Sequence, residues 1–587
     1  MDGAAKARRV IHFGEFELDD FAGELRRQGT RLRLQDQPLQ LLQILLQRPG
    51  EVITREELQQ KVWPSDTFVD FDHGINNAIK RLRETLGDTA DTPRFVETLP
   101  RRGYRFIGKI EQETPKFRSL VVLPLDNLSR DPEQEYFADG LTEALITTLA
   151  KIGDLRVVSR TSSMLYKGVR KPLREIAREL EVDTVVEGTV LRAGDRVRIT
   201  AQLIDPMKET HLWAESYDRP LRDILDLQAD VARAIAHEIQ IKLTPQEQAQ
   251  LAQAHPVDPG AYEAYLKGRY HWIKRSREGH VRACQYFQQA ILKDPASAPA
   301  YAGLADAVTI IALWGLLPPE EGCGKARGLA LKAIDLDHSL AEAHTSLAWT
   351  RFHYDCDFIT AEKEFERAIE LNPRYAVAHH WFGMCLAMMG RYEEGYTELK
   401  RAVRLDPYSS YIHFGLAFVH WCGRRHEQAV RCCQRALELD ANSVQAHVWL
   451  GVLSVAGMKW EQAVAALQRA VELSQRAPVG VACLGEAYAA AGASVDARKI
   501  LQELTSRPHV TAYFVSRIYA ALGDTNEAFK WLENSYQEHG EWMVLLMVDP
   551  RWDSLRDDAR FQDLMRRMNF PRTSEEQGPA HSLNPLP

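Results

Sequence analysis

The chain has 587 residues, of which 45% are hydrophobic and 26% are charged, and its formal net charge is -8. This composition is typical of folded domains and excludes a wholly disordered chain, and the length suggests about three or four domains. The negative net charge excludes a surface that is basic throughout, although it allows one basic face.

No segment near the N-terminus has the apolar core of a signal peptide. The longest apolar run, near residues 308–317, is about half as long as a membrane helix needs to be. All eight cysteines lie between residues 284 and 483 and form no CxxC pair, which favours free thiols in a reducing compartment. We therefore expect a cytoplasmic protein without a membrane anchor, a metal site or a cofactor.

Strand and helix signals alternate along residues 11–110. Short strands are expected at FGEFELD and RLRLQ, followed by a helix over LQLLQILLQRP. Thr54, with Glu57 three residues later, predicts the capped start of a second helix. After the loop WPSDTFVDFD, the sequence predicts a third helix over 73–87 and then two strands joined around 100–103.

The positive charge of this region is concentrated in its second half. Residues 73–109 hold eight Lys or Arg against four Asp or Glu. In the third helix Ile75, Ile79, Leu82 and Leu86 follow helical spacing and are expected to face the core. The polar and basic residues between them are left for other faces, which is the charge distribution expected of a DNA groove reader.

Residues 11–108 resemble the winged-helix domain of OmpR/PhoB-type regulators through REELQQKVW, INNAIKRLRETLG and RRGYRF. The resemblance implies that the third helix enters the major groove of double-stranded DNA and that the hairpin reaches phosphates or a neighbouring groove. The implied DNA-binding residues are Asn76, Asn77, Lys80, Arg81, Arg83, Arg101, Arg102 and Arg105.

The same resemblance implies a role for each part of this set. Arg81, with the neighbouring Asn and Lys side chains, would face bases or nearby phosphates, and Arg83 would help to hold the DNA backbone. Arg105 is the candidate for entry into the minor groove, whereas Tyr104 and Phe106 are expected to pack within the wing. The loop WPSDTFVDFD is similar to the segment that contacts RNA polymerase in relatives.

Two features of the family's pattern are missing from this sequence. Members often carry a phosphorylated receiver domain before the winged helix, but ten residues precede position 11 here. Heads similar to those of ToxR and CadC are followed by a membrane helix, which this sequence does not predict. Control of the head is therefore expected to come from the regions that follow it.

Residues 118–243 mix buried-strand patterns with amphipathic helices, which predicts an α/β domain. They resemble the TolB N-terminal domain through VVLPLDNLSRDPEQEYFADGLTEALI, VVEGTVLRAGDRVRITAQLID and HLWAESYDR. Asp126, Asp139, Glu143 and Glu187 have no metal-ligand spacing, so we interpret them as solvated or capping residues. We expect a structural coupler or a dimerisation domain.

Strand signals end near residue 261, where a repeat of 34 or 35 residues begins. Its copies include YFQQAILKDP, EFERAIELNP, ELKRAVRLDP and ALQRAVELSQ. This is the period of tetratricopeptide repeats, in which stacked helix pairs bury what one pair leaves exposed. The sequence predicts an array of about seven repeats over 261–545, followed by a C-terminal cap and a disordered tail over 546–587.

In tetratricopeptide arrays the first helices line a concave surface, and here their exposed register is expected to be aromatic and Met-rich. Such a surface would bind an extended peptide or an apolar ligand, and packing between repeats is the alternative interpretation. The predicted groove residues are Trp349, Phe352, His380, Met384, Met388, Tyr411, Phe414, Phe418 and Trp421.

Together these patterns predict a multidomain protein: an α+β winged helix, an α/β middle domain and an all-α tetratricopeptide solenoid. The first hypothesis is a transcriptional regulator whose array senses a protein or ligand partner. A homodimer on DNA is compatible with this hypothesis. The second is a non-enzymatic interaction scaffold with a degenerate winged helix. No catalytic motif set is visible in the sequence, so an enzyme is not expected.

Overall fold

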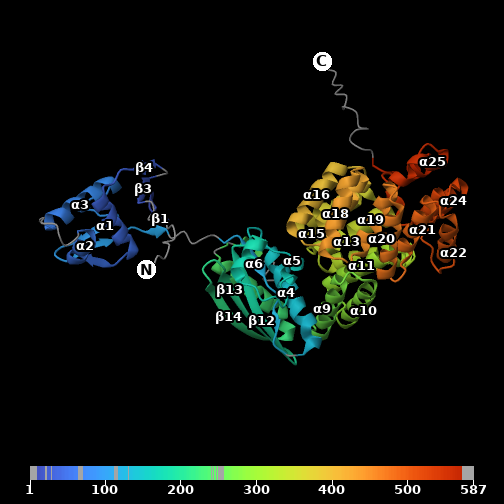
Figure 1. The fold of residues 1–587 in the computed structure, drawn as a ribbon. Helices are drawn as coiled ribbons and strands as arrows, with labels where there is room; N and C mark the ends of the chain where they lie inside the picture. Colours follow the sequence, from blue (N-terminus) through green and yellow to red (C-terminus); the bar gives the residue numbers. More distant parts are fainter. Residues whose placement is uncertain are drawn as a thin grey trace, which may run out of the picture. The chain divides into compact units, whose positions relative to one another are not determined.

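The computed structural model describes residues 10–19, 23–27, 30–63, 71–111, 117–129, 131–239, 241, 243–245, 247–248 and 257–571. The chain divides into two compact units, residues 1–116 and 117–587 (Figure 1). Among the described residues no helix is both long enough and apolar enough to cross a bilayer.

The first unit begins with an antiparallel five-stranded sheet in the order β4-β3-β2-β1-β8. Phe13 and Phe16 of this sheet pack against Phe95 and Phe106, with ring centroids 5.3 to 5.7 Å apart for three of these contacts. This aromatic cluster joins the sheet to the hairpin that follows the helices. The strands are β1 Val10–Phe13, β2 Phe16–Asp19, β3 Glu24–Arg27, β4 Thr30–Leu32 and β8 Ile110–Glu111.

Three helices and a second, three-stranded sheet complete this unit, which is the predicted winged-helix arrangement. The Thr54 hydroxyl accepts a hydrogen bond of 3.2 Å from the Glu57 N–H, so the predicted helix cap is confirmed. The sheet order is β5-β7-β6. The elements are α1 Asp36–Gln47, β5 Val52–Thr54, α2 Arg55–Val62, α3 Phe71–Leu86, β6 Val96–Leu99 and β7 Gly103–Phe106.

The second unit begins with a mixed sheet in the order β11-β9-β12-β13-β14, with β10 paired to β12. Gly194, at φ 63°, forms the turn of the predicted β12–β13 hairpin. The long strand β14 was not predicted. The elements are β9 Ser119–Val122, β10 Asp126–Asn127, α4 Glu135–Ala150, β11 Arg156–Val157, α5 Arg160–Met164, α6 Leu173–Leu180, β12 Thr184–Ala193, β13 Arg196–Asp205, β14 Thr210–Pro220 and α7 Ile224–Glu238.

The remainder of this unit is a stack of helix pairs. Eight consecutive pairs run from α9 to α24 where the sequence predicted about seven repeats. The helices are α9 Pro259–Ile273, α10 Arg277–Lys293, α11 Ala298–Leu313, α12 Lys325–Leu336, α13 Ala341–Thr350, α14 Phe358–Leu371, α15 Ala376–Met388, α16 Tyr392–Leu405, α17 Ser410–Cys422, α18 His426–Leu439, α19 Val444–Ala456, α20 Trp460–Leu473, α21 Pro478–Ala490, α22 Ser494–Thr505, α23 Ala512–Ala521 and α24 Thr525–Gln537.

Small residues occur where the two helices of a pair touch, as the repeat pattern predicted. A Cβ on Gly383 of α15 would lie 2.1 Å from Leu399 and 2.7 Å from the Gly395 carbonyl oxygen of α16. Ala361 and Ala429, on second helices, are almost fully buried. Larger side chains at these positions would separate the helices, so the close packing depends on them.

The middle region and the array are in direct contact. Glu143 of α4 is paired with Arg269 of α9, and the Ser159 hydroxyl donates to Asp406 at 2.9 Å. The interpretation of the acidic residues as solvated is therefore wrong for Glu143, and also for Asp139, which is buried and lies 2.6 Å from Lys167. Because buried carboxylates need cationic partners, both side chains stabilise the packing of this unit.

Candidate nucleic-acid interface and array interior

Helix α3 separates its residues between a core face and an outward face, as predicted. Ile75, Ile79, Leu82 and Leu86 are at most 2% exposed. Asn77, Lys80, Arg81 and Glu84 are exposed and follow i, i+3, i+4, i+7 spacing, so they share one face of the helix.

Arg83 does not belong to that face. It is 9% exposed, and its guanidinium donates to the Val96 carbonyl oxygen at 2.6 Å and to the Thr98 hydroxyl at 2.8 Å. These bonds fix α3 to strand β6, so the predicted contact with the DNA backbone is wrong for this residue. The periodicity of the helix did not reveal this, because the partner is a backbone group on a later strand.

Asn76 is exposed, but its side-chain oxygen already accepts two hydrogen bonds. The donors are the Tyr104 hydroxyl at 2.8 Å and Arg55 at 3.1 Å. The Arg55 guanidinium also lies over the Tyr104 ring, 5.3 Å from its centroid. The three residues join α2, α3 and β7, which gives Asn76 a positioning role that the sequence did not predict.

The turn between β6 and β7 carries two exposed arginines, Arg101 and Arg102. No hydrogen bond or ion pair of their side chains to another described residue is present. Arg105 differs from them, because it is half-buried on β7 and forms an ion pair with Glu97 at 2.5 Å. Since Glu97 neutralises Arg105, the turn arginines are better placed than Arg105 to meet a phosphate.

The loop between α3 and β6 is fixed by one buried carboxylate. Asp88 accepts hydrogen bonds from the backbone N–H groups of Thr89, Arg94, Phe95 and Val96, at 2.7 to 3.0 Å. Burial opposes the charged form, but these four donors outweigh it and hold the pKa of Asp88 below its usual range. The carboxylate therefore sets the spacing between the helix and the wing.

Asp88→Asn is expected to loosen this loop by about 1–3 kcal/mol, because the charge is lost and at least one backbone donor is left unsatisfied. A lowered pKa stabilises the folded state above the unfolded value of about 3.9 and ceases to do so as the pH falls further. Hydrogen exchange of the full chain should show faster exchange over residues 88–96 in the variant. Unchanged exchange at pH 7 would contradict this role.

The predicted groove residues are mostly not exposed. Eight of the nine are buried, and Tyr411 is half-buried. Most of them belong to the hydrophobic core of the array, so the expectation of an exposed concave stripe is wrong, and packing between repeats buries most of their surface. Trp421 and Trp449, on neighbouring first helices, pack with ring centroids 4.7 Å apart.

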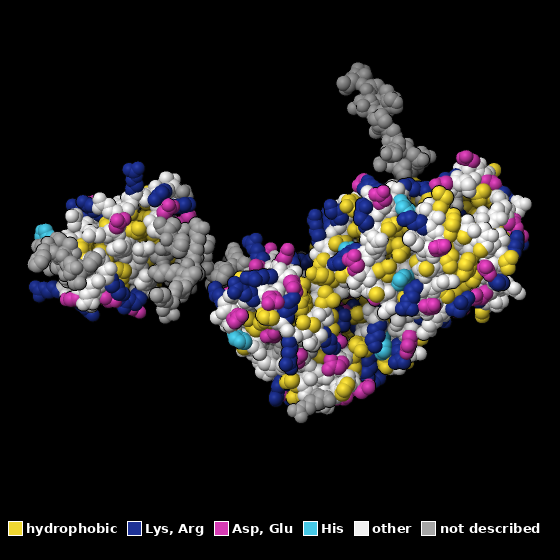
Figure 2. Space-filling model, viewed as in Figure 1, with side chains coloured by type: hydrophobic (Ala, Val, Ile, Leu, Met, Phe, Trp, Pro, Cys, Tyr) yellow, Lys and Arg dark blue, Asp and Glu magenta, His cyan; other side chains and the backbone are white. Residues whose placement is uncertain are grey.

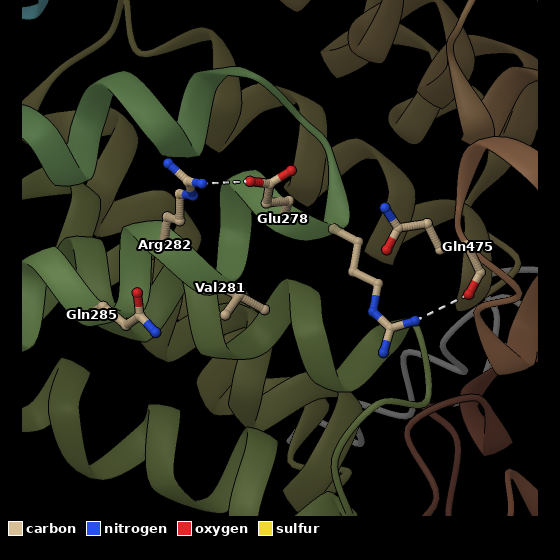
Figure 3. Close-up of a pocket in the computed structure, with 6 residues that line it drawn as sticks. Glu278, Val281, Arg282, Gln285 and Gln475 are labelled. Atoms are coloured by element: carbon tan, nitrogen blue, oxygen red, sulfur yellow. Dashed lines mark hydrogen bonds and ion pairs between the residues drawn. The ribbon is translucent and has the colours of Figure 1, made fainter.

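One reason for this burial is that the array closes on itself. Arg277, at the start of α10, donates to the Gln475 carbonyl oxygen between α20 and α21 at 3.1 Å (Figure 3). The two positions are 198 residues apart in the sequence. A shallow surface hollow of about 490 Å³ lies at this seam. Repeat periodicity predicts stacking, but it does not predict where the superhelix returns to its own beginning.

The C-terminal segment, residues 541–570, also packs over the interior of the array and contributes to this burial. It contains the turns η5 Met543–Leu545 and η6 Pro550–Leu555 and the helix α25 Ala559–Met568. Trp542 donates to the Leu313 carbonyl oxygen at 3.2 Å, and His353 bonds the Glu541 carbonyl oxygen at 2.9 Å. The Arg551 guanidinium lies 5.6 Å from the Trp421 ring centroid. This segment therefore packs against first helices that were expected to face a partner.

Glu541 is a buried carboxyl with an unpartnered oxygen among the described residues. Burial raises its pKa to about 8. A raised carboxyl pKa makes the folded state less stable as the pH rises from about 4.3, the unfolded value, to about 8.

Glu541→Gln is expected to raise the unfolding free energy at pH 8 by at least about 1 kcal/mol, because no charge then has to be buried. The gain should be smaller at pH 5. Urea unfolding followed by tryptophan fluorescence is a suitable measurement, since eleven of the twelve tryptophans follow residue 116. A variant that is no more stable than the wild type at pH 8 would count against the buried carboxyl.

The visible face of the second unit has no charge of a single sign. Figure 2 shows Lys and Arg interspersed with Asp and Glu over it. The described residues contain no group of three or more His, Cys, Asp or Glu that could hold a metal ion.

The loop predicted to contact RNA polymerase lies largely outside the described residues, as does the tail after residue 571.

Comparison with known proteins identifies the two kinds of domain. The family described as "Transcriptional regulatory protein, C terminal" matches residues 29–106, and "Tetratricopeptide repeat" matches residues 364–396. A relative named putative adenylate cyclase 3, from Rhizobium meliloti, is 41% identical over 242 residues, which are 40% of each chain.

Two regulators are also similar. Transcriptional regulator HilA of Salmonella typhimurium is 22% identical over 389 residues, which cover 65% of this chain and 68% of that protein. The cholera toxin homolog transcriptional activator of Vibrio parahaemolyticus is 39% identical over 84 residues, which cover 14% of this chain and 29% of that protein.

Proposed function

Because this chain carries an OmpR/PhoB-type DNA-binding domain at its N-terminus and a tetratricopeptide array after it, we propose that it regulates transcription by reading promoter DNA. The observation that carries the proposal is the outward face of α3 together with the β6–β7 turn. The helix face presents Lys80 and Arg81 beside Glu84, and the turn presents Arg101 and Arg102, in a protein whose net charge is -8. Exposed cations on the helix and the turn of an anionic protein favour contact with phosphates.

Within this proposal the residues have different tasks. Asn77 and Arg81 read base edges, because their side chains can donate to or pair with bases in the major groove. Lys80, Arg101 and Arg102 contact phosphates and fix the register of the head. Arg81 bonds Gln35 at the start of α1, a neutral surface contact that DNA can replace.

The array controls the head through a protein or ligand partner. Similarity to the transcriptional regulators named above supports a regulatory role, and the match to tetratricopeptide repeats supports a protein or ligand partner. The proposal includes two further partners. The loop between α2 and α3 contacts RNA polymerase, and a second copy of the chain binds beside the first on DNA. The middle region couples the head to the array.

Fluorescence anisotropy with a labelled duplex at several salt concentrations tests the proposal. Lys80→Ala and Arg102→Ala should weaken binding to all sequences and reduce the salt slope by about 1 each. Arg81→Ala should cost about 1–3 kcal/mol at one base position. Arg31→Ala, which removes an exposed arginine from the N-terminal sheet, is the matched control.

The alternative is a scaffold whose winged helix has lost DNA binding. It predicts no affinity for duplex DNA at low salt and no difference between these variants. Equal loss on every sequence from Arg81→Ala would leave DNA binding in place but contradict the base-reading role.

A further inference from the structure

A cavity of about 90 Å³ lies inside the array. Its walls come from α11, α13, α15, α17, α19 and α21, with Trp542 of the C-terminal segment as a further wall. Most of the lining is aliphatic or aromatic. Met384 and Met388 are part of it, and unbranched thioether side chains adjust readily to the shape of an occupant.

Two polar atoms of the lining have no hydrogen-bond partner among the described residues: Trp349 Nε1 and His353 Nε2. Both residues are at most 3% exposed, and their rings lie 4.2 Å apart. Buried polar groups of this kind are normally satisfied, so each unpartnered atom needs an explanation.

The chemistry of these two atoms is defined. Burial lowers the pKa of His353 to about 4, so the ring is neutral at ordinary pH. Its Nδ1 bonds the Glu541 carbonyl oxygen at 2.9 Å and must be the protonated nitrogen, because a carbonyl oxygen can only accept. Nε2 is therefore an acceptor, whereas Trp349 Nε1–H is a donor. A hydroxyl group can both donate to an atom such as Nε2 and accept from one such as Nε1–H.

Water is a poor occupant of this space. The volume holds more than one water molecule, and each would need two to four polar partners. Among the lining residues only a few polar groups, including these two and the side chain of Gln445, are present. No lining residue carries a charge at neutral pH, so an ionised molecule would be buried without a counter-ion.

We propose that this cavity binds a small neutral molecule, of about one ring, with an apolar body and a single hydroxyl group. The hydroxyl donates to His353 Nε2 and accepts from Trp349 Nε1, and the body packs on the surrounding aromatic and Met side chains. That such a molecule is the effector of the regulator rests on the proposed function; its binding does not.

Calorimetric titration of the full chain with phenol and toluene tests the inference, because the two probes have similar size and differ in the hydroxyl. Phenol should bind saturably. Trp349→Phe should weaken phenol binding about fivefold more than toluene binding, because only phenol loses a hydrogen bond. Trp213→Phe, the same change on β14, should alter neither probe.

A second variant fills part of the cavity with a larger side chain. Met384→Phe should reduce phenol binding, whereas Met207→Phe at an exposed position should not. Circular dichroism checks that each variant is folded, and the Trp349→Phe comparison decides the matter if Met384→Phe does not fold. No saturable binding of phenol, or equal effects of Trp349→Phe on both probes, overturns the inference. Duplex binding is measured without either probe, so failure of the proposed function is recognised separately.

Discussion

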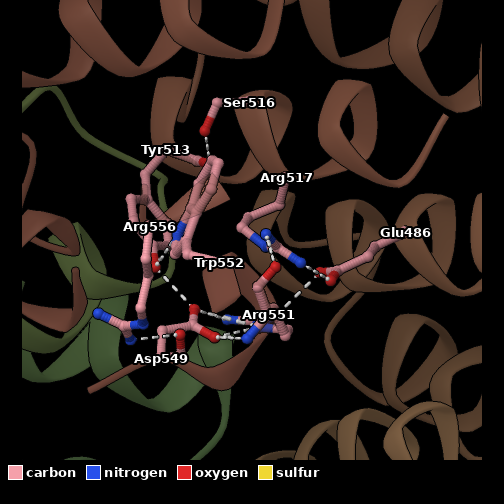
Figure 4. Close-up of polar contacts among 8 residues, drawn as sticks. All are labelled: Glu486, Tyr513, Ser516, Arg517, Asp549, Arg551, Trp552 and Arg556. Carbon is pink, nitrogen blue, oxygen red and sulfur yellow. Dashed lines mark hydrogen bonds and ion pairs between the residues drawn. The ribbon is translucent and has the colours of Figure 1, made fainter. Parts of the chain in front are cut away.

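Arg551→Met is expected to release the C-terminal segment from the array. Arg551 lies 2.8 Å from Asp549 and 2.9 Å from Glu486, and Arg517 lies 2.6 Å from Glu486 (Figure 4). Asp549 is fully buried and also accepts a hydrogen bond of 2.7 Å from the Tyr513 hydroxyl. Removing one cation leaves a buried carboxylate without its principal partner, which typically costs about 3–5 kcal/mol.

Hydrogen exchange of the full chain over residues 541–570 is the direct measurement, since the lost ion pair with Glu486 holds this segment against α21. Arg566→Met is the matched control, because Arg566 is 76% exposed and its ion pair with Asp563 joins residues of the same helix. Surface pairs of this kind contribute little to stability. Equal protection of the segment in both variants would show that the buried pair does not hold it.

The pH dependence provides an independent check through Asp549, which bonds both Arg551 and Tyr513 of α23. Burial opposes the charge of Asp549, but Arg551 and Arg517 outweigh it and lower its pKa to about 2. The ion pair therefore stabilises the folded state above the unfolded value of about 3.9 and is lost as the pH falls from there to about 2. In Arg551→Met the pKa rises, so acid release of the segment is expected at higher pH.

The sequence predicted local structure well because local structure depends on neighbouring residues. Helical spacing of Ile75, Ile79 and Leu82 predicted the buried face of α3, and Thr54 with Glu57 predicted the start of α2. The 34-residue period predicted the helix pairs. The three kinds of domain were also predicted, from motif resemblance and from the start of the repeat.

The predictions failed where a side chain meets a group far away in the sequence. Arg83 has the helical spacing of an exposed basic residue, yet its partner is the Val96 carbonyl oxygen on a later strand. Phe414 and Trp421 occupy positions that are open in a straight array, but superhelix closure and the C-terminal segment bury them. Neither contact has a local pattern, because tertiary packing alone brings the groups together.

The wing depends on one glycine, whose contacts are also with groups far away in the sequence. Gly103 has φ 152°, and a Cβ there would lie 2.0 Å from the Ile53 carbonyl oxygen. The residue pairs with Thr54 of β5 and with Leu99 of β6, so it lies where all three strands of the small sheet meet. A side chain at this position must separate β5 from β7.

Gly103→Ala is therefore expected to lower the stability of the head by about 1–3 kcal/mol, the cost of one strained backbone position, and to weaken duplex binding at least about tenfold. The larger effect on binding follows because Arg101 and Arg102 precede the glycine and Tyr104, which bonds Asn76, comes directly after it. Anisotropy titrations at low salt are the measurement.

Gly74→Ala is the matched control, since its Cβ would lie 3.5 Å from the Trp63 ring at an ordinary helical position. If Gly103→Ala retained wild-type affinity while hydrogen exchange showed the β5–β7 pair opened, the wing would have no part in DNA binding. The cations on the outward face of α3 would then have to account for all of the affinity.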